Sequence, residues 1–185
     1  MEDKNIVDLY WEKSEDAIAQ TDAKYGKYCR YISYNVLKNK EDSEECVNDT
    51  YLRAWESMPP TRPQYLAAFL GKITRNLALD RYRKNAARKR GGGQVEYVLE
   101  ELKECIPSSK CTEEIVDELA LTKVLNDFVG GLDEEKRKLF MRRYWYMSSV
   151  REIADDYEFT VSKVKMVLMR TRNELKELLE KEGLL

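Results

Sequence analysis

Apolar residues recur at helical spacing through most of the chain. Between residues 22 and 38, for example, one stripe holds Tyr25, Cys29, Ile32 and Val36. Steps of three and four residues place these side chains on one face of an amphipathic helix. We find no stretch with the strict alternation of a half-buried strand. The pattern therefore predicts an all-α protein.

Capping residues and helix breakers divide this pattern into elements. Asp42, with Glu45 three residues later, predicts the start of a helix. The segment 58–63 holds three prolines and breaks the pattern, because proline fixes φ and lacks an N–H. Pro63 suits the first turn of the next helix, which should end at the glycines 91–93.

The pattern is lost between residues 91 and 112, which are rich in glycine and acidic residues. We interpret this segment as an acidic, flexible linker that contains at most a short helical piece around Val98–Leu102. It joins two small helical domains, residues 1–90 and 113–185.

Composition adds limits to what the chain can do. Hydrophobic residues make up 43% and charged residues 36%, with a net charge of −2, which is typical of a soluble globular protein. No run approaches the ~20 apolar residues that span a bilayer. The N-terminus has no apolar signal segment. We expect a cytoplasmic protein without membrane insertion.

We expect neither a metal nor a cofactor. The chain has no histidine, the commonest acid–base side chain near neutral pH, and its four cysteines lack the close pairing of zinc sites. A redox pair of Cys105 and Cys111 stays open as a minor alternative.

Residues 149–172 have the features of a helix-turn-helix. Ser149 and Glu152 form a capping box, and Thr160 is placed to cap a second helix after a short turn. Glu158 occupies the turn position where glycine often supplies a positive φ, which costs up to ~1 kcal/mol. The second helix would present to a DNA major groove Ser162, Lys163, Lys165, Met166, Met169 and Arg170. An ordinary helical hairpin with solvated lysines is the alternative.

The helix after the prolines carries a basic face. Its exposed positions are Lys72, Arg75, Asn76, Arg83 and Lys84. Such a face suits a nucleic-acid backbone, and the amide of Asn76 can pair with a base edge. Tyr65 and Tyr82 could stack on unpaired bases. A solvated basic face is again the alternative.

Three motifs, in this order, resemble the extracytoplasmic-function group of bacterial sigma factors. They are the segment Asp42–Trp55, the segment Phe69–Asp80 and the helix-turn-helix. The resemblance implies a non-enzymatic factor that binds core RNA polymerase, recognises the −35 and −10 promoter elements and promotes promoter melting.

The resemblance also assigns roles to residues. The helix Asp42–Trp55 would dock on the clamp helices of the largest polymerase subunit through Glu45, Asn48, Asp49, Leu52, Arg53 and Trp55. The loop Pro59–Gln64, with Thr61 and Arg62, would hold a base flipped from the start-proximal strand, next to Asn76. The second domain would read the upstream element and meet the flap of the second-largest subunit, and the linker would thread the active-site cleft. An anti-sigma protein is a further candidate partner.

Three other functions are compatible with parts of the sequence. A conventional helix-turn-helix regulator explains the C-terminal half but not the Asn76 helix. An all-helical enzyme would have to use carboxylates such as Asp49 and Asp80, for which the spacing suggests no partner. An adaptor would use Tyr51 and Trp55 as anchors.

Overall fold

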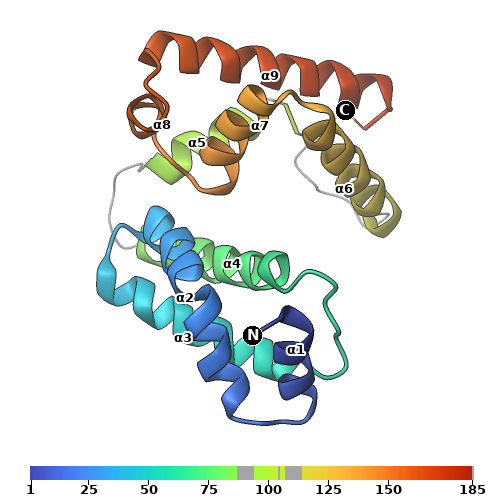
Figure 1. The fold of residues 1–185 in the computed structure, drawn as a ribbon. Coiled ribbons are helices and arrows are strands. Elements are labelled where there is room, and N and C mark those ends of the chain that lie inside the picture. Colours follow the sequence, from blue (N-terminus) through green and yellow to red (C-terminus); the bar gives the residue numbers. More distant parts are fainter. Residues whose placement is uncertain (87–93, 104, 107–113, 185) are drawn as a thin grey trace. The chain divides into compact units, whose positions relative to one another are not determined.

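The chain folds into helices grouped in two compact units. The computed structural model describes residues 1–86, 94–103, 105–106 and 114–184, without the side chains of residues 86 and 114–120. The units comprise Met1–Gly91 and Gly92–Leu185 (Figure 1). Within the described ranges every regular element is a helix, which confirms the predicted all-α class. None of the described helices has the length and apolar character needed to cross a membrane.

The first unit is a bundle of three long helices with a short one added. Its helices are α1 (Asp3–Trp11), α2 (Asp16–Leu37), α3 (Lys40–Ser57) and α4 (Leu66–Ala86). Helices α2, α3 and α4 each pack on the other two, and α1 lies on α2. The core includes Tyr10, Cys29, Tyr51, Met58 and Leu70, all buried. These residues come from every helix of the unit, so no single helix buries its apolar face alone.

Two predicted helix starts in this unit are wrong. Helix α3 is capped by Asn39 rather than Asp42: the Asn39 side chain accepts a 2.9 Å hydrogen bond from the Asp42 N–H, so Asp42 lies inside the first turn. Asparagine caps as well as aspartate, and the earlier cap adds a turn. Helix α4 begins at Leu66, so Pro63 lies in the preceding loop and not in the first helical turn.

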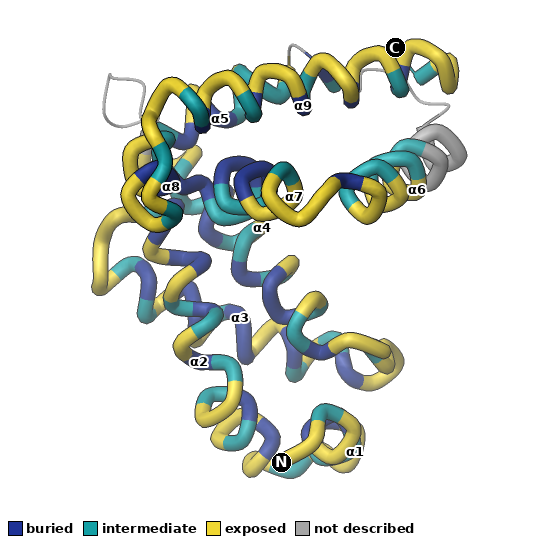
Figure 2. The backbone as a smooth tube through the Cα atoms, turned by 45° about the horizontal axis from the view of Figure 1, so that its top comes forward, coloured by how far each residue is buried: buried dark blue, intermediate teal, exposed yellow. Residues whose placement is uncertain are grey.

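The second unit is built around the C-terminal helix α9 (Val161–Lys181). The other helices are α5 (Gln94–Lys103), α6 (Glu114–Gly131), α7 (Glu134–Phe140), a π-helical turn η1 (Met141–Trp145) and α8 (Val150–Asp156). Helices α7 and α8 both pack against α9. Buried positions recur along α9 at helical spacing (Figure 2), with Val164, Leu168 and Leu175 facing the core.

Part of the segment interpreted as a linker is a structural helix of the second unit. Val95 and Val98 of α5 are buried, and the Gln94 side chain donates a 2.6 Å hydrogen bond to the carbonyl of Met147. The expected short helical piece around Val98–Leu102 is therefore a full helix held by tertiary packing. The remaining linker positions 91–93, 104 and 107–112, with Cys111 among them, lie outside the described residues.

Candidate nucleic-acid interface

Helices α8 and α9 form the helix–turn–helix, and its predicted caps are confirmed. The Ser149 side chain accepts from the Glu152 N–H at 3.1 Å, and the Glu152 carboxylate accepts from the Ser149 N–H at 2.6 Å. Thr160 accepts from the Lys163 N–H at 3.1 Å. These bonds satisfy N–H groups that the first turns leave unpaired, so both helix starts are fixed by local sequence.

The turn between the two helices contains the strain expected at Glu158. This residue has φ 53°, in the left-handed region where a Cβ is unfavourable. The Phe159 N–H donates to the Ala154 carbonyl at 2.9 Å and closes the turn. Ala154 itself is buried, as close packing of the two helices requires. The turn is thus kept in place by a backbone hydrogen bond and packing, without the glycine that would relieve it.

The exposed face of α9 carries most of the predicted base-reading residues. Ser162, Lys165 and Arg170 are exposed. Met166 is 43% exposed and Met169 is 49% exposed. Exposed methionines between cations give this face both apolar and charged contacts, which suits the groove of a duplex.

Lys163 differs from the other predicted readers. Its side chain is half-buried, lies 2.9 Å from the Glu135 carboxylate and sits over the Phe159 ring at 3.5 Å from the centroid. Contact with a phosphate would have to replace the ion pair with Glu135. Lys163 therefore contributes to the packing of α9 against α7 in the isolated chain.

A buried polar cluster beneath α9 was missed by sequence reasoning. Arg143, 5% exposed, donates to both oxygens of Glu101 at 2.7 and 3.1 Å. The hydroxyl of Tyr144 donates to the same carboxylate at 3.1 Å, and Arg172 of α9 donates to that hydroxyl at 2.6 Å. Glu101 thus connects α5, η1 and α9. No local pattern could reveal this, because its partners are 42 to 71 residues away.

The electrostatics of this cluster favour the charged carboxylate. Burial alone would raise the pKa of Glu101, but the hydrogen bonds and charge of Arg143 outweigh burial and lower that pKa below its ordinary value. Glu101 therefore stays ionised near neutral pH and neutralises the buried guanidinium of Arg143.

The basic face of α4 is present in the first unit. Lys72, Asn76 and Arg83 are exposed and lie on one side of the helix by their spacing. Lys84 is exposed and Arg75 is half-buried. A weak, exposed ion pair, 3.3 Å between Arg83 and Asp80, reduces the positive charge of this face.

The predicted DNA-contacting residues in the loop between α3 and α4 differ in how accessible they are. Tyr65 is 68% exposed, and Thr61 is exposed as well. Arg62 forms an ion pair with Asp8 of α1, and its guanidinium lies over the Trp11 ring, 5.2 Å from the centroid. Arg62 is therefore already bound within the protein, whereas Tyr65 offers an uncovered aromatic ring.

The predicted polymerase face of α3 is a continuous stripe. Glu45, Asn48 and Arg53 are exposed, and Leu52 is 54% exposed. Trp55 instead packs edge-on against Tyr10, at 6.3 Å between centroids, and is half-buried. The structure thus places Trp55 on the core side of this stripe.

An arginine of α4 neutralises two carboxylates of the stripe. Arg81 lies 2.9 Å from Glu45 and 3.3 Å from Asp49, and it also donates to the Asp42 carbonyl. Burial alone would lower the pKa of Arg81, but the two carboxylates raise that pKa above its ordinary value. Arg81 therefore connects the face of α3 to the basic helix α4, a link that sequence reasoning missed.

The cysteines of the first unit are structural. Cys29 and Cys46 are buried free thiols. Burial raises the pKa of both, to about 12 for Cys46, so neither is ionised near neutral pH. Cys105 is buried in the second unit. In the described part of the chain no cluster of cysteine and carboxylate side chains could hold a metal ion.

Comparisons with known proteins agree with the motifs. Residues 23–88 match the family Sigma-70 region 2. This segment contains α3 and the face of α4 that carries Asn76, and therefore two of the three motifs that resemble the extracytoplasmic-function sigma factors. The match confirms that resemblance.

One solved structure has a low similarity to this chain, and a search of curated proteins found no match. A solved structure of CnrH in complex with the cytosolic domain of CnrY is 20% identical over 97% of each chain, with a TM-score of 0.44.

Proposed function

We propose that the chain is a sigma factor of the extracytoplasmic-function group that binds core RNA polymerase, recognises the −35 and −10 promoter elements and promotes promoter melting. The observation that carries the proposal is the combination, in one chain, of a segment that matches sigma-70 region 2 with a capped helix–turn–helix. A conventional regulator needs only the second of these. No step requires a catalytic residue of this chain, because the polymerase performs the chemistry.

The second unit would read duplex DNA. The exposed face of α9 would enter the major groove, where Lys165 and Arg170 contact phosphates or guanine edges. The methionines would contact apolar base edges. Because phosphate contacts release counterions, this binding should weaken as salt is raised.

The first unit would bind the separated strand near the start site. Lys72 and Arg83 on α4 would hold its backbone, and Asn76 would contact a base edge. Tyr65, largely exposed, would stack on an unpaired base. A flipped base costs a few kcal/mol of stacking and pairing, which these contacts would offset.

Helix α3 would dock on the clamp helices of the largest polymerase subunit through Glu45, Asn48, Asp49, Leu52 and Arg53. Glu45 and Asp49 are paired with Arg81 and held in place before docking. A basic partner residue would share these carboxylates with Arg81. The family resemblance also suggests the polymerase flap and an anti-sigma protein as partners.

The dependence of DNA binding on core polymerase tests the proposal. In a gel shift with fragments of the source genome, we expect the isolated protein to bind weakly and the protein with sigma-free core polymerase to bind specific fragments. Tight, specific binding by the isolated protein, unchanged by core polymerase, would favour a conventional helix-turn-helix regulator.

A further inference from the structure

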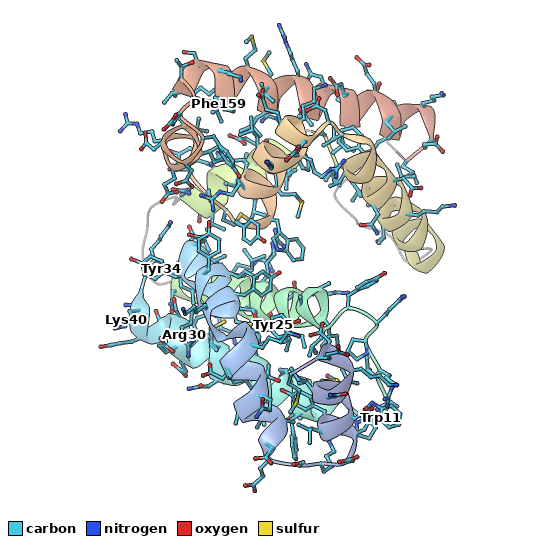
Figure 3. The ribbon with its side chains drawn as sticks, in the orientation of Figure 1. Trp11, Tyr25, Arg30, Tyr34, Lys40 and Phe159 are labelled. Carbon is cyan, nitrogen blue, oxygen red and sulfur yellow. The ribbon has the colours of Figure 1, made fainter. Side chains whose placement is uncertain are left out.

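The loop that joins α3 to α4 is tied to the N-terminal helix. Its two ends are anchored by Met58 and Leu66, both 0% exposed. Between these anchors the loop is exposed at residues 59–62 and 64–65. Helix α1 and the turn after it lie against this exposed stretch, and Figure 3 shows Trp11 beside it. Three side chains of the N-terminal segment make the connection: Asp8, Trp11 and Lys13.

Lys13 caps the C-terminal end of α3. Its ammonium donates to the carbonyls of Trp55 at 2.7 Å and Met58 at 2.9 Å, and it lies over the Trp55 ring, 4.9 Å from the centroid. The last carbonyls of a helix have no partner within the helix, so a cation there supplies the missing donor and complements the helix dipole. Lys13 has φ 54°, a conformation that a side chain adopts only at a cost. The two hydrogen bonds compensate that cost.

Trp11 and Asp8 hold the middle of the loop. The indole N–H of Trp11 donates to the Thr61 carbonyl at 3.2 Å, and its ring lies under the guanidinium of Arg62. Asp8 forms the ion pair with that guanidinium. Together with Lys13, these contacts reach the loop at its start and at its centre.

We propose that α1 and Lys13 are a positioning element that fixes the loop 58–65 in the shape that receives the promoter strand. The inference rests on the proposed function. Helix α1 lies outside the segment that matches sigma-70 region 2, so the family match assigns it no role. Lys13, Trp11 and Asp8 act through the loop and need not touch DNA themselves.

The physical advantage is preorganisation. A loop that is disordered before binding must lose its conformational freedom when the strand arrives, and this lowers affinity. The contacts from α1 remove most of that freedom in advance. Loss of the contacts should therefore weaken strand binding while it leaves the duplex-reading helix α9 and the polymerase face of α3 unchanged.

The test uses the full chain reconstituted with core polymerase. A randomised library of single-stranded DNA oligonucleotides is selected on the wild-type complex, and the affinity of the selected strand is then measured by fluorescence anisotropy for each variant. We expect Lys13→Met to weaken this affinity about tenfold, the effect of losing one or two hydrogen bonds to a charged group. Lys13→Arg, which keeps the donors, should restore it. Trp11→Phe keeps an aromatic ring at this position but loses the indole N–H, and should weaken binding by about threefold.

Asp3→Asn is the matched control. Asp3 also ties α1 to α2, through a 2.6 Å ion pair with Lys24, but at the end of α1 away from the loop. Strand affinity of this variant should equal that of the wild type. The inference is overturned if Lys13→Met and Trp11→Phe both bind the strand as the wild type does, or if Asp3→Asn loses as much. Should Lys13→Met fail to fold in a thermal melt, Trp11→Phe decides. If the wild type selects no strand, the proposed function fails first, and this inference with it.

Discussion

Single residues determine how firmly the helices of the second unit are held, and Glu158 is the clearest case. Its φ of 53° is strained for a side chain and natural for glycine. Glu158→Gly should therefore raise the free energy of unfolding by about 0.5–1 kcal/mol. Urea denaturation of the full chain, followed by circular dichroism, measures this. The control Glu177→Gly, on the exposed face of α9, should lower that free energy by a similar amount. Destabilisation by both substitutions would contradict the strain at Glu158.

Glu101 stabilises the folded state, whereas Glu158 strains it, because the carboxylate of Glu101 neutralises a buried charge. Glu101→Gln leaves Arg143 without its carboxylate and should lower the free energy of unfolding by about 2 kcal/mol. The same denaturation experiment measures this. The matched control is Glu100→Gln, whose partner Lys103 is exposed, and its effect should stay below ~0.5 kcal/mol. Equal effects of the two substitutions would show that the buried cluster adds nothing to the free energy of unfolding.

The lowered pKa of Glu101 also predicts a pH dependence. Since the folded state lowers this pKa below 4.5, the ionised carboxylate contributes its full stabilisation above that pH. The contribution is lost as the pH falls through the folded pKa. The stability difference between the wild type and Glu101→Gln should therefore narrow below pH 4.5. A difference that stays constant in acid would contradict the assigned ionisation.

Helix α9 is the element whose exposed face should carry duplex binding. Lys165→Ala and Arg170→Ala should each weaken upstream duplex binding and reduce the salt dependence by about one phosphate contact. The affinity of the complex between this chain and core polymerase for upstream duplex DNA, measured at several salt concentrations, gives both the affinity loss and the salt dependence. Lys176→Ala, on a later exposed position of α9, is the control. An unchanged salt dependence in all three variants would remove α9 from the interface.

Helix α4 should act at a different step. Asn76→Ala removes the proposed base contact while it leaves the duplex-reading α9 intact. Promoter opening, measured by permanganate footprinting, should fall about tenfold, as expected for the loss of one good base contact. Binding of closed promoter complexes should stay the same. Equal loss of binding and opening would contradict the strand-capturing role.

Local sequence predicted the helices that depend on local signals. The caps at Ser149 and Thr160 are found as expected, because a cap is a bond between neighbours. The start of α4 could not be predicted in this way. Trp11 binds Thr61 from 50 positions earlier and Asp8 binds Arg62 from 54 positions earlier, and these tertiary contacts override the preference of Pro63. Helix α5 was predicted only as a short helical piece within a linker for the same reason, since Glu101 and Val98 gain their partners only in the folded unit.

At the scale of the whole molecule, the two units divide the proposed work. The first unit holds the polymerase face of α3, the basic face of α4 and the loop tied to α1. The second unit holds the helix–turn–helix. The proposed site residues could be listed from sequence by motif, whereas Arg81, Glu101 and Lys13, which position them, appeared only in the structure.

The most direct test of the sigma-factor claim is the mapping of transcription start sites. The purified chain is mixed with sigma-free core polymerase and fragments of the source genome, and the 5′ ends of the transcripts are sequenced. We predict defined start sites that share two upstream sequence motifs and that disappear when the chain is left out. If the chain does not bind core polymerase and no transcript is formed, the sigma-factor account is contradicted.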